Sequence, residues 1–245
     1  MRVRGYAPGT PCWAAVASPD IAATRAFYNG LFGWEESGGR FAVDGRAVAG
    51  LWEQGDGPAA WLVSIATDDA AEVARAVERR GGEVRGWGDT TAVFADPSGA
   101  TFATLRRGTF FGAQVSYEPG AICWYELAAH DLSVVDDFYS EVFGWRVMEA
   151  ESVPGEPYFE FHHNGDAVAG LLPIDQRFGS RYVAPHWTVC FMVDDCAAAC
   201  DRATELGGTV ARKPVATSAG WSARVSDRYG AQFAVIELPP SLRVD

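Results

Sequence analysis

The chain contains two copies of one long pattern, and this duplication constrains its fold more than any other feature. The segment CWAAVASPDIAATRAFYNGLFGW, which begins at Cys12, aligns without a gap with CWYELAAHDLSVVDDFYSEVFGW, which begins at Cys123. The later blocks of the two copies also match, in the same order. These further matches are AVAGL at 47–51 and 167–171, and DPSGATFATL at 96–105 with DRYGAQFAVI at 227–236.

A tandem duplication across nearly all of the 245 residues predicts two domains of similar architecture. Domains are commonly about 100 to 150 residues long, which agrees with the length of each copy. The segment GTFFGAQVSYEPG, at 108–120, connects the copies. We therefore expect a first domain at residues 1–112 and a second at residues 113–245.

Each copy predicts two βαβββ modules, and so an α+β fold. In the first helix Phe27 and Tyr28 lie on the apolar face, and the same face recurs in the second copy. Asp20 precedes this helix as an N-cap and Gly33 follows it as an end signal. Aromatic residues at helical spacing usually pack inward, so the repeated Phe-Tyr pair is predicted to be core.

The overall charge and hydropathy exclude several classes of partner. The net charge of −12 disfavours a nucleic acid, because Lys and Arg supply most of the affinity for phosphates. No apolar run approaches the roughly 20 residues that span a bilayer, so a membrane protein is not expected. The N-terminal residues lack the apolar segment of a signal peptide, which favours a cytoplasmic location.

The cysteines are predicted to be reduced and buried. An odd number, five, in a chain without an export signal argues against a disulfide framework. Cys196 and Cys200 lie one helical turn apart, but no second pair of Cys or His stands at the spacing of a zinc site. The five residues are Cys12, Cys123, Cys190, Cys196 and Cys200.

The four βαβββ modules, the FY..LFGW type of helix and the DP.G turn before the last strand resemble the vicinal oxygen chelate superfamily, which includes glyoxalases, extradiol dioxygenases and bleomycin-resistance proteins. Within it, the chain is similar to two-domain glyoxalase-like proteins of actinomycetes. The resemblance implies that paired modules curl their strands into an open β-cup that holds the ligand. Four modules would form two cups, although the modules could pair within a copy or swap between copies.

The resemblance also locates the positions at which enzymes of this family carry two His and one Glu as metal ligands. The six positions, three in each copy, hold Trp, Leu, Thr or Ala, none of which binds a divalent metal strongly. A shift of one residue does not restore the set. We therefore expect no metal and no cofactor in either cup. The positions are Trp13, Leu62 and Ala103 in the first copy and Trp124, Thr188 and Ala234 in the second.

Without metal ligands, the cup walls are predicted to be apolar and aromatic, as expected for a flat organic ligand. Because side chains alternate along a strand, Trp124 and Glu126 share one face. A carboxyl beside Trp in an apolar cavity has its pKa raised, which suits a general acid or base. The alternative is an ion pair between Glu126 and an arginine such as Arg224 or Arg181.

All four histidines lie in the second copy, and so do many aromatic residues. His186, at the start of a strand, is the best histidine candidate for contact with a ligand and, with Glu126, for catalysis. His162 and His163 precede an Asn-Gly turn and are expected at an exposed hairpin. The predicted ligand-binding residues are Trp13, Trp124, Glu126, Tyr182, His186, Trp187, Thr188 and Trp221.

The sequence favours a metal-independent protein that binds an aromatic or hydrophobic small molecule, such as a specialised metabolite, for sequestration or product handling. Two alternatives remain: a metal-independent lyase, isomerase or cyclase that uses Glu126, or an interaction module with degenerate cups. Both a monomer and a homodimer are compatible with the sequence.

Overall fold

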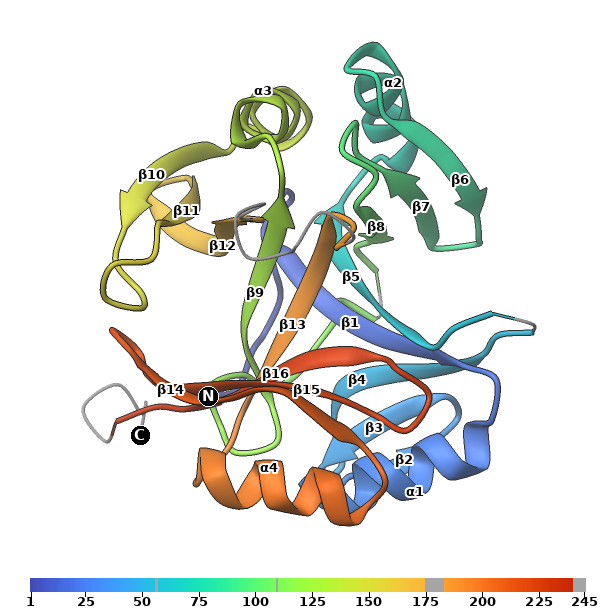
Figure 1. Ribbon diagram of the computed structural model, residues 1–245. Coiled ribbons are helices and arrows are strands. Elements are labelled where there is room, and N and C mark those ends of the chain that lie inside the picture. The colour runs from blue at the N-terminus through green and yellow to red at the C-terminus, as the bar shows by residue number, and fades with distance from the viewer. Residues whose placement is uncertain (56, 109, 175–182, 240–245) are drawn as a thin grey trace.

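The computed structural model describes residues 1–55, 57–108, 110–174 and 183–239, and these form four βαβββ modules (Figure 1). The first copy contains β1 (Pro11–Ser18), α1 (Ile21–Phe32), β2 (Glu35–Ser37), β3 (Arg40–Val43), β4 (Arg46–Glu53), β5 (Ala60–Thr67), α2 (Ala70–Arg79), β6 (Glu83–Trp87), β7 (Thr91–Ala95) and β8 (Thr101–Arg106). The second contains β9 (Ile122–Ala129), α3 (Leu132–Phe143), β10 (Arg146–Ala150), β11 (Tyr158–His163), β12 (Asp166–Pro173), β13 (His186–Met192), α4 (Cys196–Glu205), β14 (Thr209–Thr217), β15 (Gly220–Ser226) and β16 (Gln232–Glu237).

Each copy forms its own mixed sheet of eight strands. The strand order is β2-β3-β4-β1-β5-β8-β7-β6 in the first and β10-β11-β12-β9-β13-β16-β15-β14 in the second. The first strands of the two modules pair antiparallel at the centre of each sheet, while β1 with β4 and β5 with β8 run parallel. The predicted α+β fold is confirmed, and the modules pair within a copy to make each cup.

The helices begin and end where the sequence predicts. The Asp20 carboxylate accepts a hydrogen bond from the Ala23 N–H at 2.9 Å, and Asp131 caps α3 in the same way. Gly33 and Gly144 follow α1 and α3 with φ of 70°, in the left-handed region that favours glycine. None of the helices in the described ranges is long and apolar enough to span a bilayer.

The repeated aromatic helix carries the contact between the two copies. The Tyr28 hydroxyl donates to Asp227 at 3.3 Å and accepts a hydrogen bond from the Trp61 indole N–H at 2.9 Å. The second copy makes the equivalent contacts in reverse, since Tyr139 donates to Asp96 at 3.1 Å and accepts from Trp187 at 3.0 Å. The YxxxFGW pattern therefore recurs because each copy presents the same face to the other.

The tryptophan of each FGW segment completes this pseudo-symmetric contact. The Trp34 indole N–H donates to the Gly120 carbonyl, and that of Trp145 donates to the Gly9 carbonyl, both at 2.7 Å. All four of the repeated Phe and Tyr residues are buried, as predicted, in one apolar core that spans both copies. In Figure 1, α1 lies beside α4 and α2 beside α3, so helices of different copies pack together.

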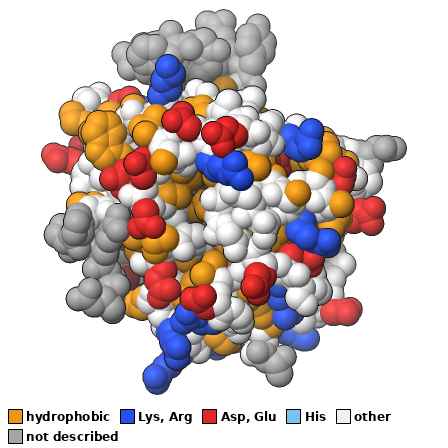
Figure 2. Space-filling model, turned by 90° about the horizontal axis from the view of Figure 1, so that it is seen from below, with side chains coloured by type: hydrophobic (Ala, Val, Ile, Leu, Met, Phe, Trp, Pro, Cys, Tyr) orange, Lys and Arg blue, Asp and Glu red, His pale blue; other side chains and the backbone are white. Residues whose placement is uncertain are grey.

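The cysteine prediction is also confirmed, because all five thiols are free and buried. On the face that carries α1 and α4, acidic and basic side chains are interspersed among apolar ones (Figure 2).

Candidate functional site: the aromatic cup of the second copy

Alternation along β9 separates the residues of the second cup from those of the core. Trp124 and Glu126 face the cup, while Leu127 faces the buried side and is fully covered. On the neighbouring strand β13, Thr188 lies opposite Glu126 and Cys190 lies opposite Trp124. One face of the sheet therefore carries three of the residues that the sequence predicts for the site: Trp124, Glu126 and Thr188.

The cup encloses a cavity of about 260 Å³ with apolar walls and a few polar groups. Trp124, Ile236 and Leu238 supply apolar surface, and Tyr117 of the connecting segment adds a second aromatic ring. This combination is typical of small-molecule sites. The remaining lining residues are Cys123, Glu126, Glu151, Ser152, Tyr158, Glu160, Thr217, Ser218, Ala219 and Ser222.

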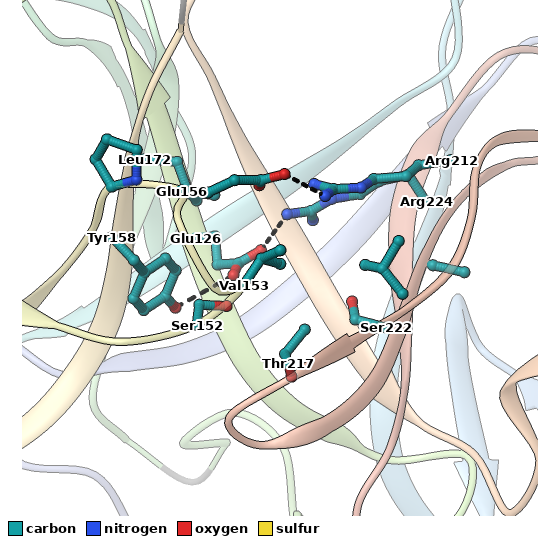
Figure 3. Close-up of a pocket in the computed structure, with 13 residues that line it drawn as sticks. Glu126, Ser152, Val153, Glu156, Tyr158, Leu172, Arg212, Thr217, Ser222 and Arg224 are labelled. Atoms are coloured by element: carbon teal, nitrogen blue, oxygen red, sulfur yellow. Dashed lines mark hydrogen bonds and ion pairs between the residues drawn. The ribbon is translucent and has the colours of Figure 1, made fainter.

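Glu126 lies at the centre of a hydrogen-bonded chain in this cup (Figure 3). The Trp124 indole N–H donates to the Tyr158 hydroxyl at 2.9 Å, and this hydroxyl donates to Oε1 of Glu126 at 3.2 Å. The Arg224 guanidinium donates to Oε2 at 2.5 Å. Both carboxylate oxygens are therefore occupied, and the ion pair with Arg224 that the sequence left open is present.

The Glu126 carboxylate stabilises the charged form of Arg224. Burial lowers the pKa of Arg224, but the adjacent Glu126 carboxylate outweighs it and raises this pKa above the ordinary value. Burial, and then the Glu126 charge, raise the pKa of Tyr158. Burial and the same carboxylate raise the pKa of the Cys190 thiol, which donates to Oε2 of Glu126 at 3.7 Å. Tyr158 and Cys190 are therefore neutral, and both donate hydrogen bonds to Glu126.

A second, exposed ion pair lines the same hollow as the first. Arg212 of β14 pairs with Glu156 at 2.8 Å, and it lies directly opposite Arg224 in the β14–β15 ladder. Figure 3 shows both arginines extending toward the glutamates on the other side of this hollow. The sequence analysis did not predict three of the residues around the cup: Arg212, Glu156 and Tyr117. The aromatic residues in the connecting segment could have indicated Tyr117.

The first cup has a similar shape and a different lining. Its cavity of about 330 Å³ is lined by Trp13, Leu62 and Ala103. Phe110 of the connecting segment forms a T-shaped pair with Trp13, with 5.0 Å between the ring centres. All three residues named at metal-ligand positions in the first copy thus lie in this cup. Carboxylate and histidine side chains do not line it among the described residues.

The donor set does not fit the metal that the superfamily implies. The six ligand positions hold Trp, Leu, Thr and Ala, and the thiol nearest to Glu126 is neutral. Within the described ranges, no group of three or more His, Cys, Asp or Glu residues is placed to hold a metal ion. We therefore derive no chemical step through a metal.

Three of the predicted ligand-binding residues lie away from the cup or outside the described ranges. Trp187 is opposite Leu127 in the ladder, on the core side, where its indole bonds to Tyr139. Trp221 is half exposed on the opposite face of β15 from Arg224. Tyr182 lies outside the described residues. These positions remove Trp187 and Trp221 from the set that a ligand in the cup could contact.

His186 lies at the start of β13, on the same face as Thr188 but beyond the cavity. Its Nδ1 is 2.8 Å from the Ala184 carbonyl. The pair formed by Trp187 and Leu127 lies between His186 and Glu126, the other predicted catalytic residue, along the ladder. His163, expected at an exposed hairpin, is instead half-buried, with Nε2 2.9 Å from the Pro8 carbonyl.

Comparison with known proteins identifies the family. A glyoxalase-like domain model matches residues 124–236. The anthracycline biosynthesis protein DnrV of Streptomyces peucetius is 38% identical over 266 aligned positions, which cover 95% of this chain and 94% of DnrV. The chain belongs to the two-domain glyoxalase-like proteins of the vicinal oxygen chelate superfamily.

Two further proteins align with this chain over most of its length. CFP32 of Mycobacterium bovis is 31% identical, with 96% of this chain and 97% of CFP32 aligned. Among solved structures, the Mn(II)-bound glyoxalase of Novosphingobium aromaticivorans superimposes with a TM-score of 0.64 at 18% identity, over 95% of this chain and 83% of that one. At that identity the structural match establishes the fold alone.

Proposed function

We propose that this protein binds a flat aromatic molecule in its second cup, without a metal ion, and sequesters it or passes it on as a product. The observation that carries the proposal is the cup itself. Its aromatic walls surround a carboxylate whose oxygens are fixed by Tyr158 and Arg224. Fixed polar groups on an apolar surface orient a ligand with little cost in ordering.

The relatives support a ligand with fused rings. DnrV is named for anthracycline biosynthesis, and it aligns with this chain along nearly its whole length. Anthracyclines contain a planar anthraquinone, which could stack on the Trp124 indole while its oxygens contact the polar groups of the cup. The family match by itself does not assign this ligand, so a direct binding measurement is required.

The test uses 1,8-dihydroxyanthraquinone as the probe and titrates it against tryptophan fluorescence. Trp124→Leu should weaken binding by about two- to tenfold, because stacking on an aromatic ring contributes about 0.5–1.5 kcal/mol beyond the buried area. Trp221→Leu is the matched control, since Trp221 lies on the other face of the sheet. Equal affinities for the wild type and both variants would contradict the proposal.

A second candidate function is a metal-independent isomerase or lyase in which Glu126 acts as a general base. The hydrogen bond from Tyr158 to Glu126 favours it, because the phenol offers a route for a proton between a ligand and the carboxylate. The ion pair with Arg224 fixes the orientation of the Glu126 carboxylate, so that a base at this position would be held in place. This candidate therefore requires turnover that depends on the carboxylate.

Glu126→Gln separates the two candidates. For an enzyme, conversion of an anthraquinone-type substrate should fall by about a hundredfold or more, the size expected for a general base, while affinity changes little. For a binding protein, no conversion is seen in either form, and affinity for the probe is the only property that responds. Product formation is followed by liquid chromatography under single-turnover conditions.

A further inference from the structure

The two cups can be compared residue by residue, because their sheets have the same register. Trp13 and Trp124 hold one position, opposite Ser64 and Cys190 on the neighbouring strand. Gly50 and Gly170 hold another, on β4 and β12. A difference at a matched position therefore reflects a difference between the cups rather than a shift of the chain.

The matched position beside these glycines carries opposite charges in the two copies. Arg40 of β3 lies directly opposite Gly50, whereas Glu160 of β11 lies directly opposite Gly170. Both side chains line the cavity of their own cup. The duplication has thus kept the strand pairing and reversed the sign of one lining residue.

The other lining charges reinforce this difference. In the second cup, Glu126 is paired with Arg224, and the other charged residues that line the cavity are Glu151 and Glu160, both acidic. His162 Nε2 lies 3.1 Å from the Glu160 carboxylate. In the first cup, Arg40 is the single charged residue that lines the cavity within the described ranges. The first cup is therefore positive and the second is negative.

Aromatic surface surrounds Arg40. Its guanidinium carbon lies 4.2 Å from the centre of the Phe110 ring, and Phe110 forms a T-shaped pair with Trp13. Trp52, on the rim, keeps 40% of its surface exposed. A guanidinium that stacks on a ring by its face still presents its N–H groups at its edge, where they can meet a carboxylate or phenolate.

We propose that the first cup is a second ligand site, which selects planar aromatic anions such as aromatic carboxylates through Arg40, while the second cup disfavours them. The ring of the ligand would lie against Trp13, Phe110 and Trp52, and its anionic group would reach the Arg40 guanidinium. This assignment concerns a different cavity from the proposed function and does not depend on it.

The test compares two ligands with the same ring, 2-naphthoate and 2-naphthamide, by isothermal titration calorimetry and by quenching of tryptophan fluorescence. Wild-type protein should bind naphthoate more tightly than naphthamide. In Arg40→Gln, naphthoate should bind about tenfold or more weakly, because a charge-assisted hydrogen bond is lost, and naphthamide affinity should stay within about twofold. Arg40→Lys should keep the preference for the anion.

Three controls assign the signal to the first cup. The part of the quenching that is lost in Trp52→Phe comes from this cup, because Trp52 lies on its rim. Arg85→Gln removes an arginine from the same sheet that is paired with Glu83 and does not line the cavity, so it should bind like the wild type. Glu160→Gln should leave the Trp52 signal unchanged.

Two results would overturn the proposal. The first is a wild-type protein that shows no Trp52 response to naphthoate. The second is an Arg40→Gln variant that keeps the ratio of the two affinities. The proposed function is measured separately, with the anthraquinone probe and Trp124→Leu, so either proposal can fail while the other stands.

Discussion

At the scale of single residues, Glu126 shows how one carboxylate determines the chemistry of the second cup. Its side chain is 11% exposed, and its partner Arg224 is 28% exposed. Removing one member of a buried ion pair costs more than removing both, because the remaining charge keeps its desolvation cost without a partner. The pair is therefore a place where single and double substitutions should differ.

Arg224→Met should lower the free energy of unfolding by about 2 kcal/mol, less than the roughly 3–5 kcal/mol of fully buried pairs because water reaches the guanidinium. The double variant Arg224→Met with Glu126→Gln should recover about half of this loss, since no unpaired charge remains. Urea denaturation of the wild type, the single variants and the double variant measures the coupling. Strictly additive losses would show that the ion pair has no energetic coupling.

At the scale of helices and strands, the sequence predicts the fold well because the duplication repeats whole modules with their end signals. Helix α1 begins after Asp20, whose carboxylate caps it, and ends before Gly33, which adopts a left-handed conformation. The same counting along strands gives Trp124, which lines the cavity, and Thr188, which lies opposite Glu126 in the ladder. These features are local, since they depend on spacing within one element.

Contacts between elements are where the sequence prediction failed. Because side chains alternate along β13, Trp187 faces away from the side on which Thr188 lies. Its indole N–H donates to the Tyr139 hydroxyl on the core side. The aromatic residue type alone does not reveal this contact. The sequence offered Arg224 and Arg181 as alternative partners of Glu126, and the ion pair with Arg224 is present. The irregular register of the β14–β15 pairing, which positions Arg224, cannot be read from the sequence. The positions of Trp187 and Arg224 both depend on contacts between elements that are distant in the sequence.

At the scale of the whole molecule, the two copies are held together by matched pairs of a buried tyrosine and a buried aspartate. Tyr139 reaches Asp96 and Tyr28 reaches Asp227, each across the boundary between the sheets. Burial raises the pKa of both aspartates above the ordinary value, although hydrogen bonds from nearby backbone and side-chain groups lower it in part. The contact between the copies should therefore depend on pH.

The sign of this dependence follows from the raised pKa values. Since the folded-state pKa of Asp96 exceeds its unfolded value of about 3.9, its contribution to stability is fully present below that value and is lost as the pH rises through the folded-state pKa. The difference in unfolding free energy between the wild type and Asp96→Asn should therefore favour the wild type more at pH 4 than at pH 7. Urea denaturation at several pH values measures this difference.

Asp68 provides a control of opposite sign on the same copy. It is exposed, and its hydrogen bond with Arg107 lowers its pKa, so its contribution is present above the unfolded value and is lost as the pH falls through the folded-state pKa. The difference between the wild type and Asp68→Asn should thus shrink on acidification, while that for Asp96→Asn grows. If both differences moved in the same direction with pH, the buried pairs between the copies would not be the source of the effect.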